Sequence, residues 1–355
     1  MDAATLGWGG AGLVLLVGGA EALVRGASRL AAAFGLSRLV IGLTVVAAGT
    51  SSPEMAVSVG AVLGGQADLA LGNVVGSNIF NVLFILGVCA LITPLHVAAQ
   101  LVQLDVPVMI GVSLLVLVMG SDGAIGPMDG LFLLAGLIAY VWYSIVEGRR
   151  ASNRPDEVEA GPRGAAAVAA QVAWVALGLL LLIVGARWLV ASAVAIARAF
   201  EVSELVIGLT VVAAGTSLPE VATSVVASLR GERDIAVGNV VGSNIFNILG
   251  ILGISALVGG GLPVNPAIQS FDGPVMVAVA LACLPILFTG HVISRGEGAV
   301  FVGYYVAYTA YLIFAAARHD ALPAFSAAMV TFVLPLTIIT LVVLAVRAGR
   351  RSAPG

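Results

Sequence analysis

Residues 41–88 of this chain return almost unchanged at residues 207–254. The two segments align without a gap at an offset of 166 residues, and 35 of their 48 positions are identical. Each contains GTSxPE followed by GNVVGSNIFN. A long repeat at one fixed offset indicates two copies of one structural unit that pack against each other. We therefore expect a fold made of two similar halves.

The composition places these halves in a lipid bilayer. Of the 355 residues, 60% are hydrophobic and only 10% are charged, and the mean hydropathy is +1.10. Soluble domains carry about 25% charged residues. The composition therefore predicts an all-α polytopic membrane protein. A net charge of −3 with no basic patch argues against nucleic acid as a partner.

Eleven apolar runs have about the length of a transmembrane helix. Such a helix needs roughly 20 mostly apolar residues. We predict a first five-helix repeat at 1–146, a cytoplasmic linker at 147–165, a second repeat at 166–317, and an additional helix with a cytoplasmic tail at 318–355. The spans are expected near residues 5–30, 37–64, 68–92, 104–120, 125–146, 166–197, 203–229, 234–258, 271–289, 298–317 and 324–346.

The arginines predict how the chain crosses the membrane. With the N-terminus outside, thirteen arginines fall on the inner side and two on the outer side. Since cytoplasmic loops are enriched in basic residues, this favours an outer N-terminus and an inner C-terminus in the cell (inner) membrane. Five helices is an odd number, so the second half enters the membrane upside down. Inverted repeats of this kind are typical of secondary transporters, whose binding site lies between the repeats near the midplane.

Two glutamates occupy equivalent positions near the middle of apolar spans. Glu54 and Glu220 each follow a proline in the GTSxPE motif. A carboxylate at the centre of a membrane helix costs about 2.5–3.5 kcal/mol on insertion scales, so its presence indicates function. Pro53 and Pro219 break their helices and free backbone carbonyls that lipid cannot satisfy. We expect these carbonyls at Ala47–Gly49 and 213–215, with nearby hydroxyls supplied by Thr50, Ser51, Thr216 and Ser217.

The GNVVGSNIFN motif supplies further oxygen atoms. Ser77 and Asn81 are four residues apart and share one helix face, as do Ser243 and Asn247. Together with the glutamates they form an all-oxygen set, which suits hard cations such as calcium better than zinc or copper. Two carboxylates balance one divalent ion, and the same oxygens could hold sodium instead. Competition for one site is what an antiporter requires.

At these residues the chain resembles the calcium/cation antiporter superfamily, specifically its sodium/calcium exchanger branch of the prokaryotic type. The resemblance covers residues 5–317 and implies ten helices in two inverted halves. It implies that Glu54 and Glu220 bind calcium, with the carbonyls of Ala47 and Ala213 and the hydroxyls of Thr50 and Thr216. It also implies that sodium uses these shared ligands together with Ser51, Ser77, Ser217 and Ser243. The first and sixth helices would slide across the rest.

The resemblance leaves several points open. An eleventh helix exceeds the ten of the family, and Asn247 replaces an aspartate of some relatives, which argues against potassium co-transport. Neither Asn81 nor Asn247 is assigned to direct or water-mediated binding. No cofactor is expected, and a monomer is expected to suffice for transport of calcium and sodium. Proton/calcium exchange is the nearer alternative and a passive cation channel the more distant one. An enzyme is not expected, because the chain has no lysine, HExxH motif or mid-span aspartate pair for an intramembrane protease.

Overall fold

The computed structural model describes residues 3–152, 164–284 and 291–335, and these residues are almost entirely helical. Seven of the described helices are long and apolar enough to cross a bilayer. The segments Arg38–Thr50 and Ser52–Leu63 meet at a 44° bend and together would make an eighth. The protein is therefore a multi-pass membrane protein. Parts of the expected linker and of the ninth and eleventh spans lie outside the described residues.

Both halves fold into a similar succession of elements, although η4 of the first half has no counterpart among the described elements of the second. The first half comprises α1 (Ala3–Phe34), α2 (Arg38–Ile41), η1 (Gly42–Val46), α3 (Ala47–Thr50), α4 (Ser52–Leu63), α5 (Ala67–Phe80), η2 (Asn81–Leu86), α6 (Gly87–Ile92), β1 (Leu95–His96), η3 (Leu101–Asp105), α7 (Val106–Met119), η4 (Gly120–Asp122), β2 (Ala124–Ile125) and α8 (Pro127–Ser152). The second comprises α9 (Ala165–Ala199), α10 (Glu204–Ile207), η5 (Gly208–Val212), α11 (Ala213–Gly215), α12 (Leu218–Leu229), α13 (Arg233–Phe246), η6 (Asn247–Leu252), α14 (Gly253–Gly259), β3 (Leu262–Pro263), η7 (Ile268–Asp272), α15 (Gly273–Leu281), β4 (Val292–Ile293) and α16 (Arg295–Ala316). Beyond the second half lie α17 (Leu322–Ala328) and η9 (Met329–Val333).

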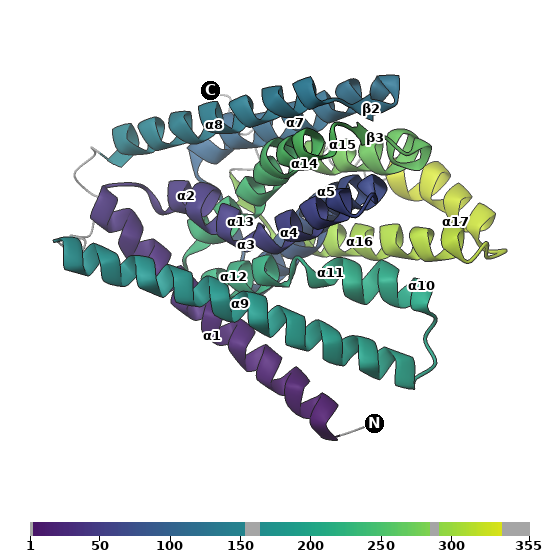
Figure 1. Ribbon diagram of the computed structural model, residues 1–355, viewed down its shortest axis with the longest axis horizontal. Helices are drawn as coiled ribbons and strands as arrows, with labels where there is room; N and C mark the ends of the chain where they lie inside the picture. Colours follow the sequence, from purple (N-terminus) through teal and green to yellow (C-terminus); the bar gives the residue numbers. More distant parts are fainter. Residues whose placement is uncertain (1–2, 153–163, 285–290, 336–355) are drawn as a thin grey trace, which may run out of the picture.

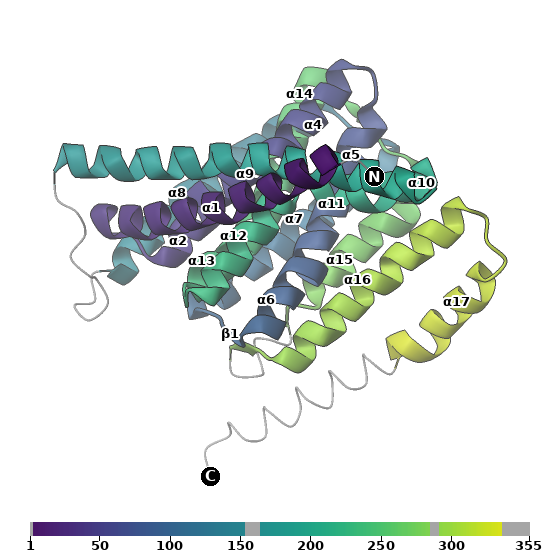
Figure 2. The ribbon, with the colours of Figure 1, turned by 90° about the horizontal axis from the view of Figure 1, so that it is seen from below.

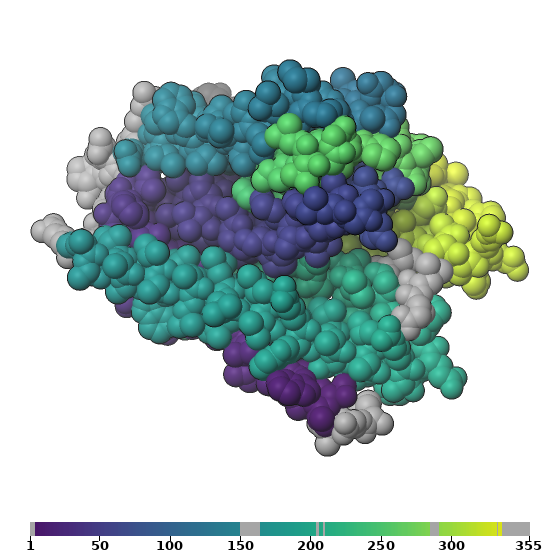
Figure 3. All heavy atoms as spheres, in the orientation of Figure 1, coloured from purple at the N-terminus to yellow at the C-terminus, as the bar shows by residue number. Residues whose placement is uncertain are grey.

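The two halves are interleaved, not placed side by side. Figure 3 shows helices of the first half alternating with helices of the second across one face of the molecule. The short strands repeat this exchange, because β1 pairs with β4 and β2 pairs with β3. The core therefore lies between the repeats and not within either one.

The long helices α1 and α9 cross outside this core (Figures 1 and 2). Glycines allow their backbones to touch. A Cβ built at Gly12 would lie 2.8 Å from the carbonyl oxygen of Gly185, and one at Gly19 would lie 2.8 Å from that of Gly178. Small residues permit such close approach of membrane helices, so any side chain larger than hydrogen would separate the pair.

Candidate ion-binding site

The site lies where the second helix of each half is interrupted. Ser51 (φ −78°, ψ 5°) separates α3 from α4, and Ser217 (φ −88°, ψ 8°) precedes α12. Pro53 and Pro219 sit in the first turn of the helix that follows each break, where a missing N–H costs least. These breaks place Glu54 and Glu220 in the first turns of α4 and α12.

The glutamates are held across the two halves. Ser51 Oγ donates to Glu220 Oε1 over 3.0 Å, and Ser217 Oγ donates to Glu54 Oε1 over 2.7 Å. Each glutamate is 1% exposed. Because each serine binds the carboxylate of the other repeat, the two acidic groups belong to one site at the interface between the halves.

Six oxygens of the predicted site are buried without a hydrogen-bond partner in the described part of the chain. They are Glu54 Oε2, Glu220 Oε2, Asn81 Oδ1, Asn247 Oδ1, Thr216 Oγ1 and Ser243 Oγ. A buried polar atom left unpaired costs about 1–3 kcal/mol, and more when it is charged. These six oxygens come from residues of both repeats, and oxygen atoms are the ligands that hard cations prefer.

Neighbouring asparagines orient these ligands, and the sequence reasoning missed them. Asn81 Nδ2 donates to Asn244 Oδ1 over 3.0 Å, and Asn247 Nδ2 donates to Asn78 Oδ1 over 3.0 Å. Each of these amide nitrogens is thereby engaged across the repeats, so the Oδ1 atoms of Asn81 and Asn247 stay available. Asn78 and Asn244 are in the repeated GNVVGSNIFN motif, and that duplication was a usable signal.

A second pair of asparagines, also missed by the sequence reasoning, donates hydrogen bonds to the backbone carbonyls of the glutamates. Asn239 Nδ2 donates to Ser224 Oγ over 3.0 Å and to the carbonyl of Glu220 over 3.5 Å. Asn73 does the same for Ser58 and Glu54, over 2.9 and 3.2 Å. Both asparagines fix the backbone at a glutamate and not its carboxylate.

The remaining predicted ligands differ between the halves. Thr50 Oγ1 donates to Asn239 Oδ1 over 3.0 Å, and the carbonyl of Ala47 accepts from the Ser51 N–H over 3.0 Å and from Thr50 Oγ1 over 3.3 Å. That carbonyl therefore accepts two hydrogen bonds in this conformation. Ser77 Oγ accepts from Ser217 Oγ over 3.4 Å. Ala213, the counterpart of Ala47, is exposed.

Other buried groups stand apart from this site. Asp105, which directly precedes α7, is fully buried and accepts a hydrogen bond from Tyr140 Oη over 3.0 Å. Asp272 and Tyr308 form the equivalent pair over 2.8 Å. Among the described residues no three His, Cys, Asp or Glu side chains form a cluster that could hold a metal ion, so a cation at this site would depend on amide and hydroxyl oxygens as well.

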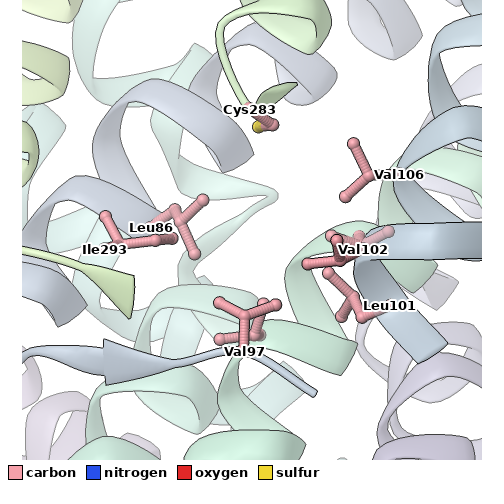
Figure 4. Close-up of a pocket in the computed structure, with 9 residues that line it drawn as sticks. Leu86, Val97, Leu101, Val102, Val106, Cys283 and Ile293 are labelled. Atoms are coloured by element: carbon pink, nitrogen blue, oxygen red, sulfur yellow. The ribbon is translucent and has the colours of Figure 1, made fainter. Parts of the chain in front are cut away.

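A small pocket near η3 is not an ion site. Leu86, Val97, Leu101, Cys283 and Ile293 are among its lining side chains, which contribute carbon and sulfur only (Figure 4). Its volume is about 10 Å³, which is at the lower limit for one water molecule. Without oxygen ligands it offers nothing to a hard cation.

Membrane-spanning helices around buried oxygens from both halves are typical of an ion transporter, and the comparisons with known proteins show such a family. Residues 5–146 and 170–314 match the family described as sodium/calcium exchanger protein. The chain is 37% identical to the inner membrane protein YrbG of Escherichia coli, over 85% of this chain and 94% of YrbG. It is 35% identical to the sodium/calcium exchanger MaX1 of Methanosarcina acetivorans, over 85% of this chain and 97% of MaX1.

A solved structure of the sodium-calcium exchanger NCX_Mj matches with a TM-score of 0.76 and 32% identity, covering 87% of this chain and 99% of that one. The chain belongs to the sodium/calcium exchanger family. It is therefore a cation antiporter and not an enzyme, as the resemblance predicted.

Proposed function

We propose that the protein exchanges sodium for calcium by alternating access at the site between its two repeats. Calcium binds to Glu54 and Glu220, whose two charges balance it, with oxygens of Thr50, Thr216, Ala47 and Ala213. Sodium competes for the same carboxylates and adds the hydroxyls of the serines at 51, 77, 217 and 243. The observation that carries the proposal is the set of six buried, unpartnered oxygens drawn from both halves.

Ten helices in two inverted five-helix repeats, at 1–146 and 166–317, form this exchanger, and the additional helix at 318–355 follows them. The reciprocal bonds between Asn78 and Asn244 support a two-fold relation, because each side-chain amide donates to the other residue's carbonyl, over 3.2 and 3.3 Å. The arginine bias orients the N-terminus outward and the linker at 147–165 toward the cytoplasm.

The two copies of the glycine motif pack differently, which supports alternating access. We name Arg38–Thr50 the first gate and residues 204–215 the second gate. A Cβ at Gly238 would lie 2.9 Å from a carbonyl oxygen of the first gate, and one at Gly242 would lie 2.5 Å from another. At the equivalent Gly72 and Gly76 of α5, nothing lies within 4 Å. All three elements of the first gate pack against α13, whereas in the second gate only α11 packs comparably against α5.

The hydrogen bonds and the burial of side chains also differ between the first gate and the second gate. Thr50 of the first gate is bonded to Asn239, whereas Thr216 has a buried hydroxyl oxygen without a partner among the described residues. Val46 is fully buried, and its counterpart Val212 is 48% exposed. Since the N-terminus is oriented outward, the second gate lies in the outer half of the membrane. The conformation is then closed to the cytoplasm and open to the outside.

Closing the second gate would complete the cycle. By the internal symmetry, it would bring Thr216 onto Asn73 and the backbone near residues 205–209 onto Gly72 and Gly76. The crossed helices α1 and α9 slide as one body between the two states. If three sodium ions enter for each calcium, one net charge moves inward, and each 100 mV of inside-negative potential contributes about 2.3 kcal/mol to calcium extrusion.

Ion flux into proteoliposomes tests this proposal. An outward sodium gradient should drive uptake of calcium-45, whereas a proton or potassium gradient alone should not. Uptake driven by protons without sodium would replace the proposal with proton/calcium exchange. Calcium flux with no counter-ion and no saturation would identify a passive channel instead.

A further inference from the structure

The crossed pair α1 and α9 covers one side of the site and leaves the other uncovered. Both helices pack against α12, which has Glu220 in its first turn. Val226 and Ala227 of α12 share a buried cluster with Leu23 and Ala27 of α1. Among the described helices, the equivalent α4 has no comparable packing against α1 or α9.

Thr223 lies on the covered face of α12. It is three residues after Glu220 and four before Ala227, and residues at these spacings share one face of a helix. Thr223 is fully buried, and its Oγ1 has no hydrogen-bond partner in the described part of the chain. The equivalent residue of α4 is Val57, which is 46% exposed.

The two halves therefore differ at a position where the repeat itself supplies an apolar alternative. A valine at residue 223 would fill nearly the same volume without burying an unsatisfied hydroxyl, which is destabilising. The hydroxyl is thus unfavourable in the conformation described. It would gain a partner if α1 moved away from α12 and water reached this face.

We propose that Thr223 lines the cytoplasmic route to the site and that its hydroxyl replaces a water molecule around the ion as it passes between Glu220 and the cytoplasm. The proposal rests on the proposed function, because it requires α1 to uncover α12. A threonine oxygen one turn from the carboxylate shortens the distance that a partly dehydrated cation travels without a protein ligand. The outer route has Val57 at the equivalent place and offers no such ligand.

Thiol labelling tests the route without any assumption about the coupling ion. The two native cysteines are buried, so a Cys89→Ala, Cys283→Ala background removes competing thiols. In this background we expect Thr223→Cys to react with a membrane-impermeant thiosulfonate from the cytoplasmic side only, and Val57→Cys to react from the outside only. Labelling of Thr223→Cys from the outside, or from neither side while calcium-45 counterflow persists, would overturn the proposal. If that variant does not insert, Ala227→Cys on the same face gives the same readout.

Transport kinetics test the hydroxyl itself. We expect Thr223→Val to raise the half-saturating concentration of cytoplasmic calcium by roughly three- to tenfold, the size of one lost hydrogen bond, and to leave the external value unchanged. Thr223→Ser should restore the wild-type cytoplasmic value. Val57→Thr, the reciprocal change, should leave the cytoplasmic value unaltered. If Thr223→Val changed the cytoplasmic and the external half-saturating calcium concentrations equally, Thr223 would have a structural role only. Absence of sodium-driven flux in the wild type would instead contradict the proposed function, whatever the labelling result.

Discussion

Adding one methyl group at two equivalent glycines should push the exchanger in opposite directions. At Gly242 a Cβ would lie 2.5 Å from the carbonyl oxygen of Leu43 and 2.7 Å from its Cα, whereas at Gly76 it would meet nothing within 4 Å. Gly242→Ala therefore strains the closed first gate, and Gly76→Ala fits the present conformation but obstructs closure of the second gate. Overpacking of this kind costs about 1–3 kcal/mol, which is roughly a 5- to 150-fold change in the ratio of the two states.

Cysteine labelling at the two gates measures this shift. Val212 is 48% exposed and Val46 is fully buried, so Val212→Cys should label rapidly in the wild-type background and Val46→Cys slowly. Gly242→Ala should accelerate labelling at position 46 and slow it at position 212. Gly76→Ala should leave labelling at position 212 fast and slow the transport cycle.

The control is Gly18→Ala, because a Cβ at Gly18 meets nothing within 4 Å. It should change neither labelling rate. General unfolding would accelerate labelling at both Val46→Cys and Val212→Cys, which distinguishes it from a gate shift. Labelling patterns that change in the same direction in Gly242→Ala and Gly76→Ala would rule out opposite shifts of the two gates.

Three further predictions concern the surroundings of the site. Glu21 of α1 forms an ion pair with Arg230 at the end of α12, and such partly exposed pairs contribute little stability. Glu21→Gln should therefore raise the rate of cytoplasmic labelling of the α12 face by less than about fivefold, and only at low salt. An effect that persists in 1 M salt would exclude this electrostatic origin. Gly185→Ala should lower the melting temperature in detergent by several degrees, because its Cβ would lie 2.7 Å from the Gly12 carbonyl oxygen; an unchanged melting curve would contradict the close packing. Asn239→Ala leaves the Glu220 backbone carbonyl without its side-chain donor. We therefore expect calcium binding to be roughly tenfold weaker by isothermal titration. Unaltered calcium affinity would show that Asn239 does not position Glu220.

The sequence was sufficient to predict which residues approach one another but not how they are bonded. Duplicated acidic residues beside prolines indicated a shared site, and Glu54 and Glu220 do lie in one buried cluster. That Ser51 binds Glu220, not its own neighbour Glu54, depends on how the halves interlock. Residue spacing within one half contains no information about that interlocking.

The difference between Ala47 and Ala213 was beyond sequence reasoning for a physical reason. Both lie in the identical stretch IGLTVVAAGTS, yet Ala47 is buried and Ala213 is exposed. In the proposed alternating-access cycle the two halves exchange roles, so identical local sequences would meet different environments in any one state. A sequence specifies both states, whereas one structure contains only one of them. Thr223 is a different case. The repeat alignment already shows threonine at residue 223 where the first half has Val57, but only the structure shows that Thr223 is buried.

Calcium binding to the purified protein and to its Glu54→Gln and Glu220→Gln variants shows whether the two carboxylates share one ion. Isothermal titration should give one calcium site in the wild type and no measurable binding in either variant, with all three proteins eluting alike from a sizing column. Retained calcium affinity in a single variant would mean that the two carboxylates do not share one ion, and that the site between the repeats is not where calcium binds.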